Sequence, residues 1–418
     1  MVLSVLRTRD FRLLWLSQSV SLLGDGLIIV AIGLFVTRLT GDPADVGAVL
    51  AAYALPLVAF ILFGGVIADR LPRQAVMVVS DSARAVLHGA LAVLIVTGAV
   101  RIWQMVLIGV LFGTAQAFFQ PAYTGLVPQT VATEGDIQAA QALSGVSREL
   151  SSFLSPALAT LLVLQVGGGA AFALDAATFV VSAIALSRVR GRPRGEPGAR
   201  STMLAELREG WTAVRERGWV WGTIAGFSAA ILVALAPFFV LAPAVSREMY
   251  GTDAVYGITN AVWGGGTVLG ALVGLRWRPR YPMRTGLLIG MFWPAQIALF
   301  GLGPPLGLLF PVTALAGFGL GTFGVWWETA LAQRIPAHLL SRVSAWGWMG
   351  SLALLPAGYL IAGPVADLVG AVPVLIGGGA IGTVTLGLAL LAPSTWTLSR
   401  LAAGEPAAMT RIEQSTVG

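Results

Sequence analysis

One carboxylic acid stands out because it lies in the middle of an apolar segment. Asp25 is near the centre of residues 13–37, between Gly24 and Gly26. An ionisable group at the centre of a bilayer costs about 2.5–3.5 kcal/mol on insertion scales, and it usually faces a polar interior. The glycines leave room for water or a close neighbour, and desolvation favours the protonated form of a carboxylate. Asp25 is therefore a candidate proton carrier; the alternative is a polar packing group at a helix distortion.

Other apolar segments also carry charged residues. Arg148 and Glu149 are adjacent in the sequence, and adjacent positions of a helix do not face each other, so the two side chains require different partners. Arg148 is a candidate partner for Asp25 or for an anionic group of a ligand. Glu149, Asp175 and Glu328 are further candidates for proton coupling, with a structural role as the alternative for each.

A short charged motif lies where one apolar segment ends and the next begins. Residues 65–74 read GVIADRLPRQ. Gly65 permits close approach of two helices, and Asp69 with Arg70 and Arg73 can form an inter-helix latch that breaks and forms again. The alternative is that the arginines only mark membrane topology and that Asp69 lies at a solvated helix end.

The composition shows that water is not the main solvent of this chain. Of the 418 residues, 56% are hydrophobic and 11% are charged, whereas soluble domains carry about 25% charged residues. All 26 basic residues are arginine, and they are scattered between apolar blocks, which argues against a nucleic-acid partner. The absence of cysteine excludes disulfides and thiolate metal sites. No phosphate-binding loop, dinucleotide fingerprint or hydrolase motif is found, so we expect neither an enzyme nor a cofactor.

Long apolar segments predict an all-α membrane protein, because backbone polar groups in hydrocarbon must be satisfied within each helix. Twelve transmembrane helices in two six-helix bundles are expected. We expect domains at 1–190, 191–217, 218–395 and 396–418, the second a linker with an interfacial amphipathic helix and the last a flexible tail. The predicted spans are 13–37, 45–68, 75–98, 102–122, 138–165, 169–187, 219–244, 255–275, 285–301, 305–328, 340–363 and 371–392.

The arginines predict the orientation of these spans. Apart from Arg84 and Arg148, which lie inside spans, all arginines except Arg38, Arg101 and Arg247 fall on the side that holds both termini. The positive-inside rule assigns that side to the cytoplasm. We therefore expect a multi-pass protein of a bacterial inner membrane with cytoplasmic N- and C-termini.

The two halves of the chain resemble each other. Leu126-Val127-Pro128 follows the fourth span, and Arg334-Ile335-Pro336 follows the tenth. The span after each motif carries a proline, Pro156 or Pro356, which predicts a helix kink.

Tryptophan is concentrated in the second half and offers stacking surfaces for a bulky amphipathic substrate, with an interfacial belt as the alternative. His88 is more typical of a packed polar residue than of a proton relay. The candidate substrate-binding tryptophans are Trp263, Trp293, Trp326, Trp327 and Trp346.

Several of these motifs resemble those of a known family. The segment 65–74 resembles the major facilitator loop signature G-x-x-x-D-R-x-G-R-R, with proline and glutamine at two positions. Similarity to the bacterial exporter branch that includes enterobactin exporters and macrolide efflux proteins extends through residues 9–15, Gly24-Asp25, Asp81 to Arg84, 175–179 and 333–336. The resemblance implies the major facilitator fold, export driven by proton exchange, and a gating role shared by Asp81 and Arg84.

These observations predict a proton-coupled secondary exporter of amphipathic small molecules that works by alternating access. We expect small-molecule substrate, protons and the lipid bilayer as its partners, and a monomer. Span 5 departs from the antiporter signature, since it keeps Pro156 without the neighbouring glycines. An uptake carrier, a lipid flippase and a non-transporting membrane scaffold or sensor stay open as alternatives.

Overall fold

The computed structural model describes residues 2–131, 135–190 and 203–399. Within these ranges it describes the backbone but not the side chains of 2–4, 61–69, 135, 138, 203–207, 337–338, 341 and 351. Residues 191–202 of the predicted linker 191–217 and residues 400–418 of the predicted tail 396–418 lie outside the described residues.

The first half of the chain folds into a bundle of long helices. α2 packs on α4, α3 packs on α4 and α6, and α1 packs on α5 and α6. A short 3-10 helix, η1 (Val2–Arg7), precedes them. The helices are α1 (Arg9–Leu39), α2 (Pro43–Arg70), α3 (Arg73–Val96), α4 (Ile102–Thr130), α5 (Gly135–Gln165) and α6 (Gly168–Leu186).

The second half repeats this arrangement with helices that are more often interrupted. A π-helical turn, η2 (Ile231–Leu235), joins α8 (Gly218–Ala230) to α9 (Ala236–Tyr250) in one span. The chain breaks at Met291 between α11 (Pro282–Gly290) and α12 (Phe292–Gly301), and at Leu354 between α14 (Ala337–Ala353) and α15 (Leu355–Val369). The other elements are α7 (Met203–Arg215), α10 (Ala254–Arg276), α13 (Leu306–Arg334), α16 (Ala371–Leu388), η3 (Ala389–Leu391) and α17 (Pro393–Thr397).

The predicted all-α membrane fold is confirmed. Ten helices of the described chain are long and apolar enough to cross a membrane. The other two predicted spans correspond to α5, which carries Arg148 and Glu149, and to the broken pair α11–α12. No strand occurs among the described residues.

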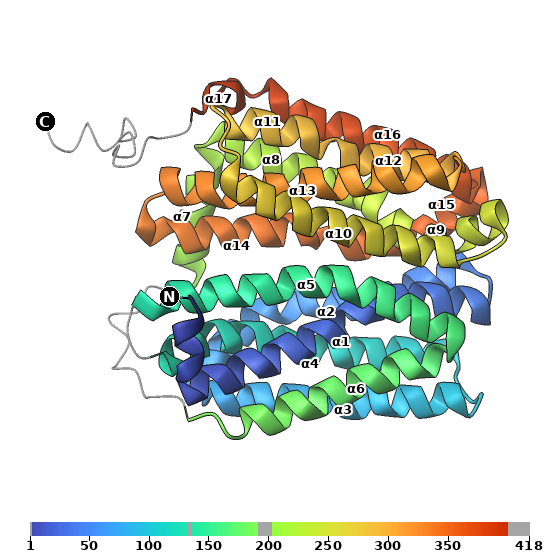
Figure 1. Ribbon diagram of the computed structural model, residues 1–418, viewed down its shortest axis with the longest axis horizontal. Helices are drawn as coiled ribbons and strands as arrows, with labels where there is room; N and C mark the ends of the chain where they lie inside the picture. The colour runs from blue at the N-terminus through green and yellow to red at the C-terminus, as the bar shows by residue number, and fades with distance from the viewer. Residues whose placement is uncertain (1, 132–134, 191–202, 400–418) are drawn as a thin grey trace, which may run out of the picture.

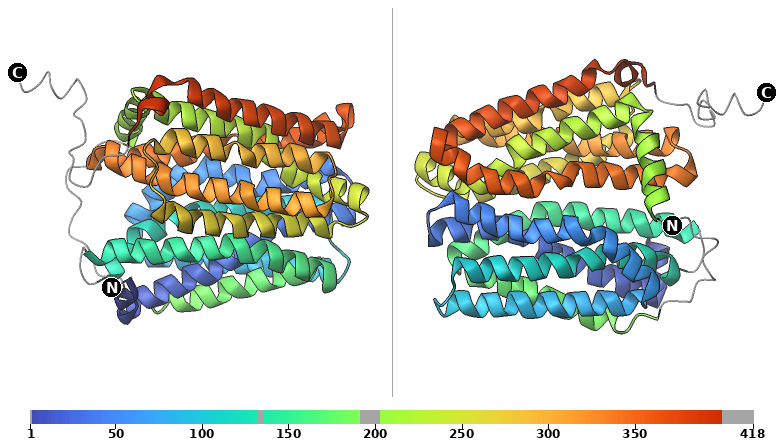
Figure 2. Two further views of the ribbon diagram at one scale, coloured as in Figure 1. Left: turned by 45° about the horizontal axis from the view of Figure 1, so that its top comes forward. Right: turned by 180° about the vertical axis from the view of Figure 1, so that it is seen from behind.

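The two halves lie against each other as separate layers (Figures 1 and 2). They meet through α5 on α10 and through α2 on α15. Small residues permit this contact: a Cβ on Gly264 would lie 2.9 Å from the Cα of Phe153, and a Cβ on Gly363 would lie 2.7 Å from the Cα of Ala44. Close backbone approach at glycine is how helices pack in a membrane, where no hydrophobic force drives them together.

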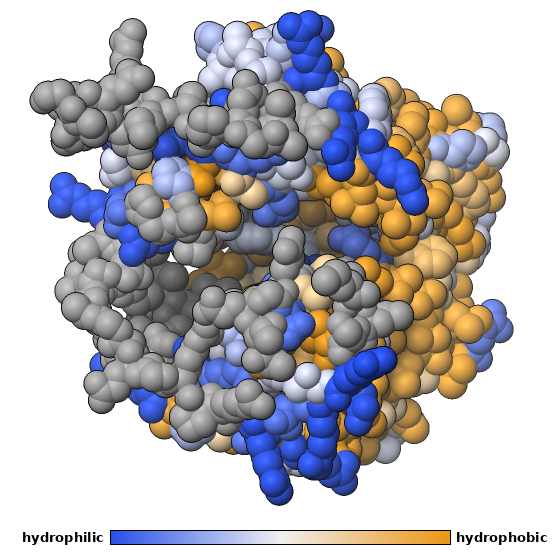
Figure 3. All heavy atoms as spheres, turned by 60° about the vertical axis from the view of Figure 1, so that its left-hand side comes forward, coloured by the Kyte–Doolittle hydropathy of each residue, from blue (hydrophilic) through white to orange (hydrophobic). Residues whose placement is uncertain are grey.

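The two ends of the molecule differ. The end that carries η1 and α17, here called the terminal end, is hollowed between the halves (Figure 3). At the opposite end, here called the far end, the halves are joined. There Gly257, at the start of α10, packs on Thr160 of α5, and Gly33 of α1 faces the hydroxyl of Tyr256. The structure is thus closed at the far end and open at the terminal end.

An ion pair joins the halves at the far end. Arg38, near the end of α1, donates from Nε to Oδ2 of Asp253 at 2.6 Å and from Nη2 to Oδ1 at 2.8 Å. Arg247 donates to the same carboxylate at 2.8 Å. Burial opposes ionisation of Asp253, but the hydrogen bonds from Arg38 and then Arg247 outweigh it and hold its pKa below the ordinary 3.8. Asp253 is therefore charged at neutral pH, and the ion pair is lost only as the pH falls below that value.

This ion pair predicts the effect of neutralising Asp253. In Asp253→Asn, the far end should open more often, because Arg38 and Arg247 lose the charge that joins the halves. The chain has no cysteine, so Thr160→Cys introduces a single thiol that is nearly isosteric and 7% exposed. We expect maleimide labelling of this thiol to accelerate roughly fivefold, as for a loss of about 1 kcal/mol. Arg101→Gln, which removes a far-end arginine that caps α4, is the control. Equal acceleration in both variants would show that the ion pair of Asp253 does not hold the far end closed.

Candidate functional site

One face of α3 carries three ionisable residues in the interior of the first half. Asp81, Arg84 and His88 are spaced three and four residues apart, so they are neighbours on the helix surface. Their side chains are at most 1% exposed. This face turns toward α1, α2 and α6, which supply the partners of all three residues.

Arg84 is the centre of this group. Its Nη1 lies 3.4 Å from both carboxylate oxygens of Asp25 on α1, and its Nη2 donates to Asp81. The guanidinium carbon lies 4.2 Å from the ring centre of Phe179 and 4.6 Å from that of Phe119. Aromatic faces attract a desolvated cation, so a charge that would be costly in hydrocarbon is stabilised by two carboxylates and two rings.

The second carboxylate of α3 is fixed from α6. Ser182 donates its hydroxyl to Oδ2 of Asp81 at 2.5 Å, while Oδ1 of Asp81 accepts from Arg84. Both oxygens of Asp81 are therefore satisfied by hydrogen bonds inside the protein.

His88 links α2 to α6. Its Nδ1 is hydrogen-bonded to Oδ2 of Asp175, and its Nε2 lies 3.0 Å from the hydroxyl of Tyr53. The imidazole stacks on Phe112 with ring centres 4.1 Å apart. Thr178 completes the set with a hydroxyl 3.4 Å from Oδ1 of Asp175. Tyr53, His88 and Asp175 thus form a continuous hydrogen-bonded chain.

The two glycines beside Asp25 allow α1 to approach its neighbours. A Cβ on Gly24 would collide with the carboxylate of Asp175 and the hydroxyl of Thr178. A Cβ on Gly26 would lie 2.6 Å from the hydroxyl of Ser155, which donates to the carbonyl of Leu23 at 2.9 Å. The room predicted around Asp25 is therefore filled by a close neighbour on each side.

Asp25 is the one carboxylate of the cluster that is partly exposed. Its side chain is 22% exposed, whereas Asp81 and Asp175 are fully buried. The cluster contains three carboxylates but only one guanidinium and one imidazole. If every carboxylate were ionised, a net negative charge would be buried, and uncompensated buried charge is costly. This arrangement suits exchange of a proton through Asp25.

The prediction that Arg148 pairs with Asp25 is wrong. Arg84 occupies that position, while Arg148 on α5 is exposed and exerts Coulombic attraction on Glu149 and on Glu328 of the other half. Glu149 is half-buried and Glu328 is exposed. These three residues are therefore separate from the buried cluster.

The candidate gating residues whose side chains are described lie in two environments. Arg70 is exposed, and Arg73 donates to the carbonyl of Gly125 on α4 at 2.6 Å. Asp81 and Arg84 belong to the buried cluster instead. The side chains of Gly65 and Asp69 lie outside the described residues, so the latch at Asp69 stays a prediction.

The candidate tryptophans are distributed over several sites. Trp326, 4% exposed, is held by the carbonyls of Gly274 and Trp277. Trp327 packs edge-on against Trp219, and Trp346 contacts Trp211 of α7. Trp263 and Trp293 line a small cavity within the second half. Trp293 and Trp327 are linked through the stacked rings of Phe227 and Phe323.

The two prolines differ in their effect on the backbone. α5 continues as one helix through Pro156, whereas Pro356 lies in the first turn of α15, directly after the break at Leu354.

Sequence reasoning missed several members of the cluster. Tyr53, Ser182 and Thr178 carry no signal alone, because polar residues of this size are common inside helices. The spacing of Asp81, Arg84 and His88 was the available signal, since it places three ionisable groups on one face of an apolar helix.

Curated relatives match most of the chain. It is 28% identical over 361 residues to the multidrug efflux pump Tap of Mycolicibacterium fortuitum, covering 83% of this chain and 87% of that protein. It is 27% identical over 374 residues to macrolide efflux protein A of Streptococcus pyogenes, covering 86% of this chain and 90% of that protein.

A solved structure has the same fold. The nucleoside transporter NupG superposes with a TM-score of 0.70 at 14% identity, over 93% of this chain and 99% of that chain. The family model for the Major Facilitator Superfamily matches residues 14–355. This match confirms the resemblance of the sequence motifs, and it shows a transporter rather than an enzyme. The chain belongs to the Major Facilitator Superfamily.

Proposed function

We propose that this protein is a proton-coupled exporter of amphipathic small molecules. The observation that carries the proposal is the cluster around Arg84, in which three carboxylates share two basic groups and Asp25 is the one carboxylate that is partly exposed. A group that exchanges protons needs an accessible position and an environment in which both charge states are stabilised. Asp25 has both.

Coupling follows from the charge balance of the cluster. When Asp25 is ionised, it attracts Arg84 across 3.4 Å. When Asp25 binds a proton, Arg84 keeps Asp81 as its ionic partner, and the attraction between α1 and α3 weakens. Because α1 also contacts α9 and α10 of the other half, a change in its position alters the contact between halves. Proton binding thereby shifts the balance between the two open states.

Export is supported by the names of the relatives, which are a multidrug efflux pump and a macrolide efflux protein. The hollow at the terminal end lies between halves that carry both apolar and charged side chains. Arg148 and Glu328 place opposite charges on different halves, and aromatic residues such as Trp327 and Trp346 lie on the second half. An amphipathic molecule would find both kinds of partner.

We place the terminal end in the cytoplasm of a bacterial inner-membrane protein that works as a monomer. The arginine distribution supports this orientation, because only Arg38, Arg101 and Arg247 lie at the other side. In this orientation the structure is open to the cytoplasm, as an exporter must be when it takes up its cargo.

The function is tested by an efflux panel in cells that lack their own pumps. Macrolides, dyes and siderophore-like compounds are loaded, and their release is followed with and without a protonophore. We expect protonophore-sensitive release of at least one amphipathic compound. Release that is insensitive to the protonophore would contradict proton coupling. Accumulation in place of release would indicate an uptake carrier, and movement of labelled lipid without a pH gradient would indicate a flippase.

The role of Asp25 is tested by Asp25→Asn in proteoliposomes. Asparagine keeps the size and hydrogen bonding but cannot titrate. We expect normal expression and retained substrate binding, with a loss of roughly tenfold or more in uphill efflux, about 1.4 kcal/mol. Substrate binding should also lose its pH dependence. Glu149→Gln is the matched control, since Glu149 is half-buried outside the cluster. If Asp25→Asn still concentrates substrate, Asp25 is not the coupling residue. A loss in Glu149→Gln would then assign coupling to Glu149, whereas activity in both variants would leave Asp175 and Glu328 as the candidates.

Orientation is tested with reporter fusions. A reporter fused after Gly195 should be cytoplasmic, and one fused after Thr252 should be external. Thr252 directly precedes Asp253, so the second fusion reports on the far end. A cytoplasmic signal from both would refute the twelve-span topology.

A further inference from the structure

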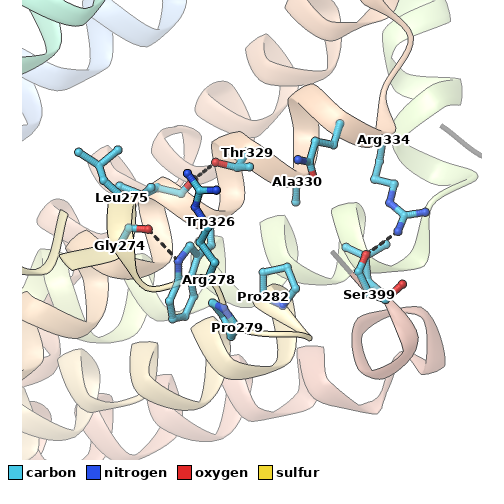
Figure 4. A pocket seen from close by; sticks show the side chains of 13 residues that line it. Gly274, Leu275, Arg278, Pro279, Pro282, Trp326, Thr329, Ala330, Arg334 and Ser399 are labelled. Carbon is cyan, nitrogen blue, oxygen red and sulfur yellow. Dashed lines mark hydrogen bonds between the residues drawn. The ribbon is translucent and has the colours of Figure 1, made fainter. Parts of the chain in front are cut away.

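A cavity of about 330 Å³ opens at the terminal end of the second half (Figure 4). It lies between the last turns of α10 and α13, beside the loop that joins α10 to α11 and beside Leu398 and Ser399. This volume is within the range of small-molecule sites, roughly 300–1,000 Å³. The cavity lies within one half and is separate from the cluster around Arg84.

The cavity is lined by positive charge that no described carboxylate neutralises. Arg278 has neither a hydrogen bond nor an ion pair with any described residue, and Arg334 donates only to the carbonyl of Ser399, at 2.5 Å. The sequence has no acidic residue between Asp253 and Glu328, whereas residues 276–284 read RWRPRYPMR. Two arginines therefore face a cavity with their donors available.

Some of the other hydrogen-bond donors that line the cavity are already used within the protein, and others are available. Nε1 of Trp326 is already used by the carbonyls of Gly274 at 3.3 Å and Trp277 at 3.0 Å. This bond fixes the end of α10 against α13. Gln333 also lines the cavity and has no hydrogen bond among the described residues. The hydroxyl of Thr329 donates to the carbonyl of Val325 at 2.7 Å, so the available donors are two guanidinium groups, the amide of Gln333 and the hydroxyl of Ser399, a set suited to phosphate oxygens.

The internal repeat shows why this charge needs a partner from outside. α10 packs on α13 as α2 packs on α4. In each pair, the first helix is followed by a junction that carries arginines. In the first half, α2 ends with Asp69 beside Arg70, and Arg73 at the start of α3 donates to the α4 carbonyl of Gly125. The junction of α10 and α11, residues 276–284, has four arginines and no acid.

The surroundings of the cavity indicate a lipid rather than a soluble anion. Leu275 lines the cavity and is 61% exposed, Leu272 one turn earlier is 50% exposed, and Trp277 is 45% exposed. An apolar strip along a transmembrane helix thus continues into the basic cavity. Exposed tryptophan and arginine at the end of a span are typical of the headgroup region of a membrane. Basic pockets between spans on the cytoplasmic side bind lipid headgroups.

We propose that this cavity binds the headgroup phosphate of an anionic phospholipid, held by Arg278 and Arg334, with the acyl chains lying along Leu275 and Leu272. The bound lipid would neutralise the loop and join the ends of α10, α13 and the segment that follows η3. This site is distinct from the transport pathway, so it stands or fails separately from the proposed function.

The test uses the full-length protein in detergent and dioctanoyl phosphatidylglycerol as the probe. Binding is followed by native mass spectrometry and by the rise in the melting temperature with lipid concentration. We expect the double variant Arg278→Gln/Arg334→Gln to bind roughly tenfold more weakly, as for the loss of charge-assisted hydrogen bonds. Arg278→Lys/Arg334→Gln should bind more tightly than this double variant, because lysine restores the charge at position 278 without the planar fork of arginine.

Matched controls decide between the explanations. Arg280→Gln removes one charge from the same loop, as Arg278→Gln does, but Arg280 lies over the ring of Tyr281 at 5.4 Å and does not line the cavity. Its affinity should stay unchanged; a loss equal to that of the double variant would overturn the site in favour of general surface charge. Equal binding of dioctanoyl phosphatidylcholine would overturn the preference for anionic lipid. Equal stabilisation by inorganic phosphate alone would overturn the lipid in favour of a soluble anion.

Discussion

A guanidinium buried inside a membrane protein must find its counter-charges within the protein, and Arg84 sets this constraint on the first half. It is 1% exposed and far from either end of α3. Its partners come from α1 and from its own helix, and its aromatic neighbours come from α4 and α6. Other features follow from this need. Gly24 lets α1 lie close enough for Asp25 to reach Arg84, and Ser182 satisfies the oxygen of Asp81 that Arg84 does not.

The second half has no such charge at the equivalent depth among its described residues. Its interior cavity is lined by Asn260, Trp263, Trp293 and Gln296, all neutral, beside the π-helical turn η2. Nε1 of Trp293 and Nε2 of Gln296 are buried without a hydrogen-bond partner. The two bundles therefore share a packing plan but differ in electrostatics. The buried ionisable groups belong to the first bundle. The second bundle has a neutral cavity beside a π-helical turn, a feature that is frequent at functional sites.

Much of the fold could be predicted from the sequence, because hydrocarbon tolerates few kinds of backbone and the apolar segments are long. The depth of Asp25 and the need for glycine beside it were also predictable from one segment. The identity of its partner was not. Asp25 and Arg84 lie on different helices, and only the packing of α1 against the interior of the bundle decides between Arg84 and Arg148. From the sequence, Arg148 was an equally good candidate partner for Asp25, since it is also an arginine inside an apolar span. Its exposed position on α5 depends on the arrangement of the two halves.

The bidentate contact between Arg38 and Asp253 has a consequence for biogenesis. The two residues are separated by 215 positions, so the first span leaves the ribosome long before its counter-ion has been synthesised. Arg247 precedes Asp253 as well, and both arginines wait for the same carboxylate. Two of the three arginines on the far side thus acquire their shared counter-ion only when the second half is inserted beside the first. The ion pair between the halves therefore forms only after residue 253 has been inserted, and a chain interrupted before residue 253 lacks the carboxylate that joins the two halves at the far end.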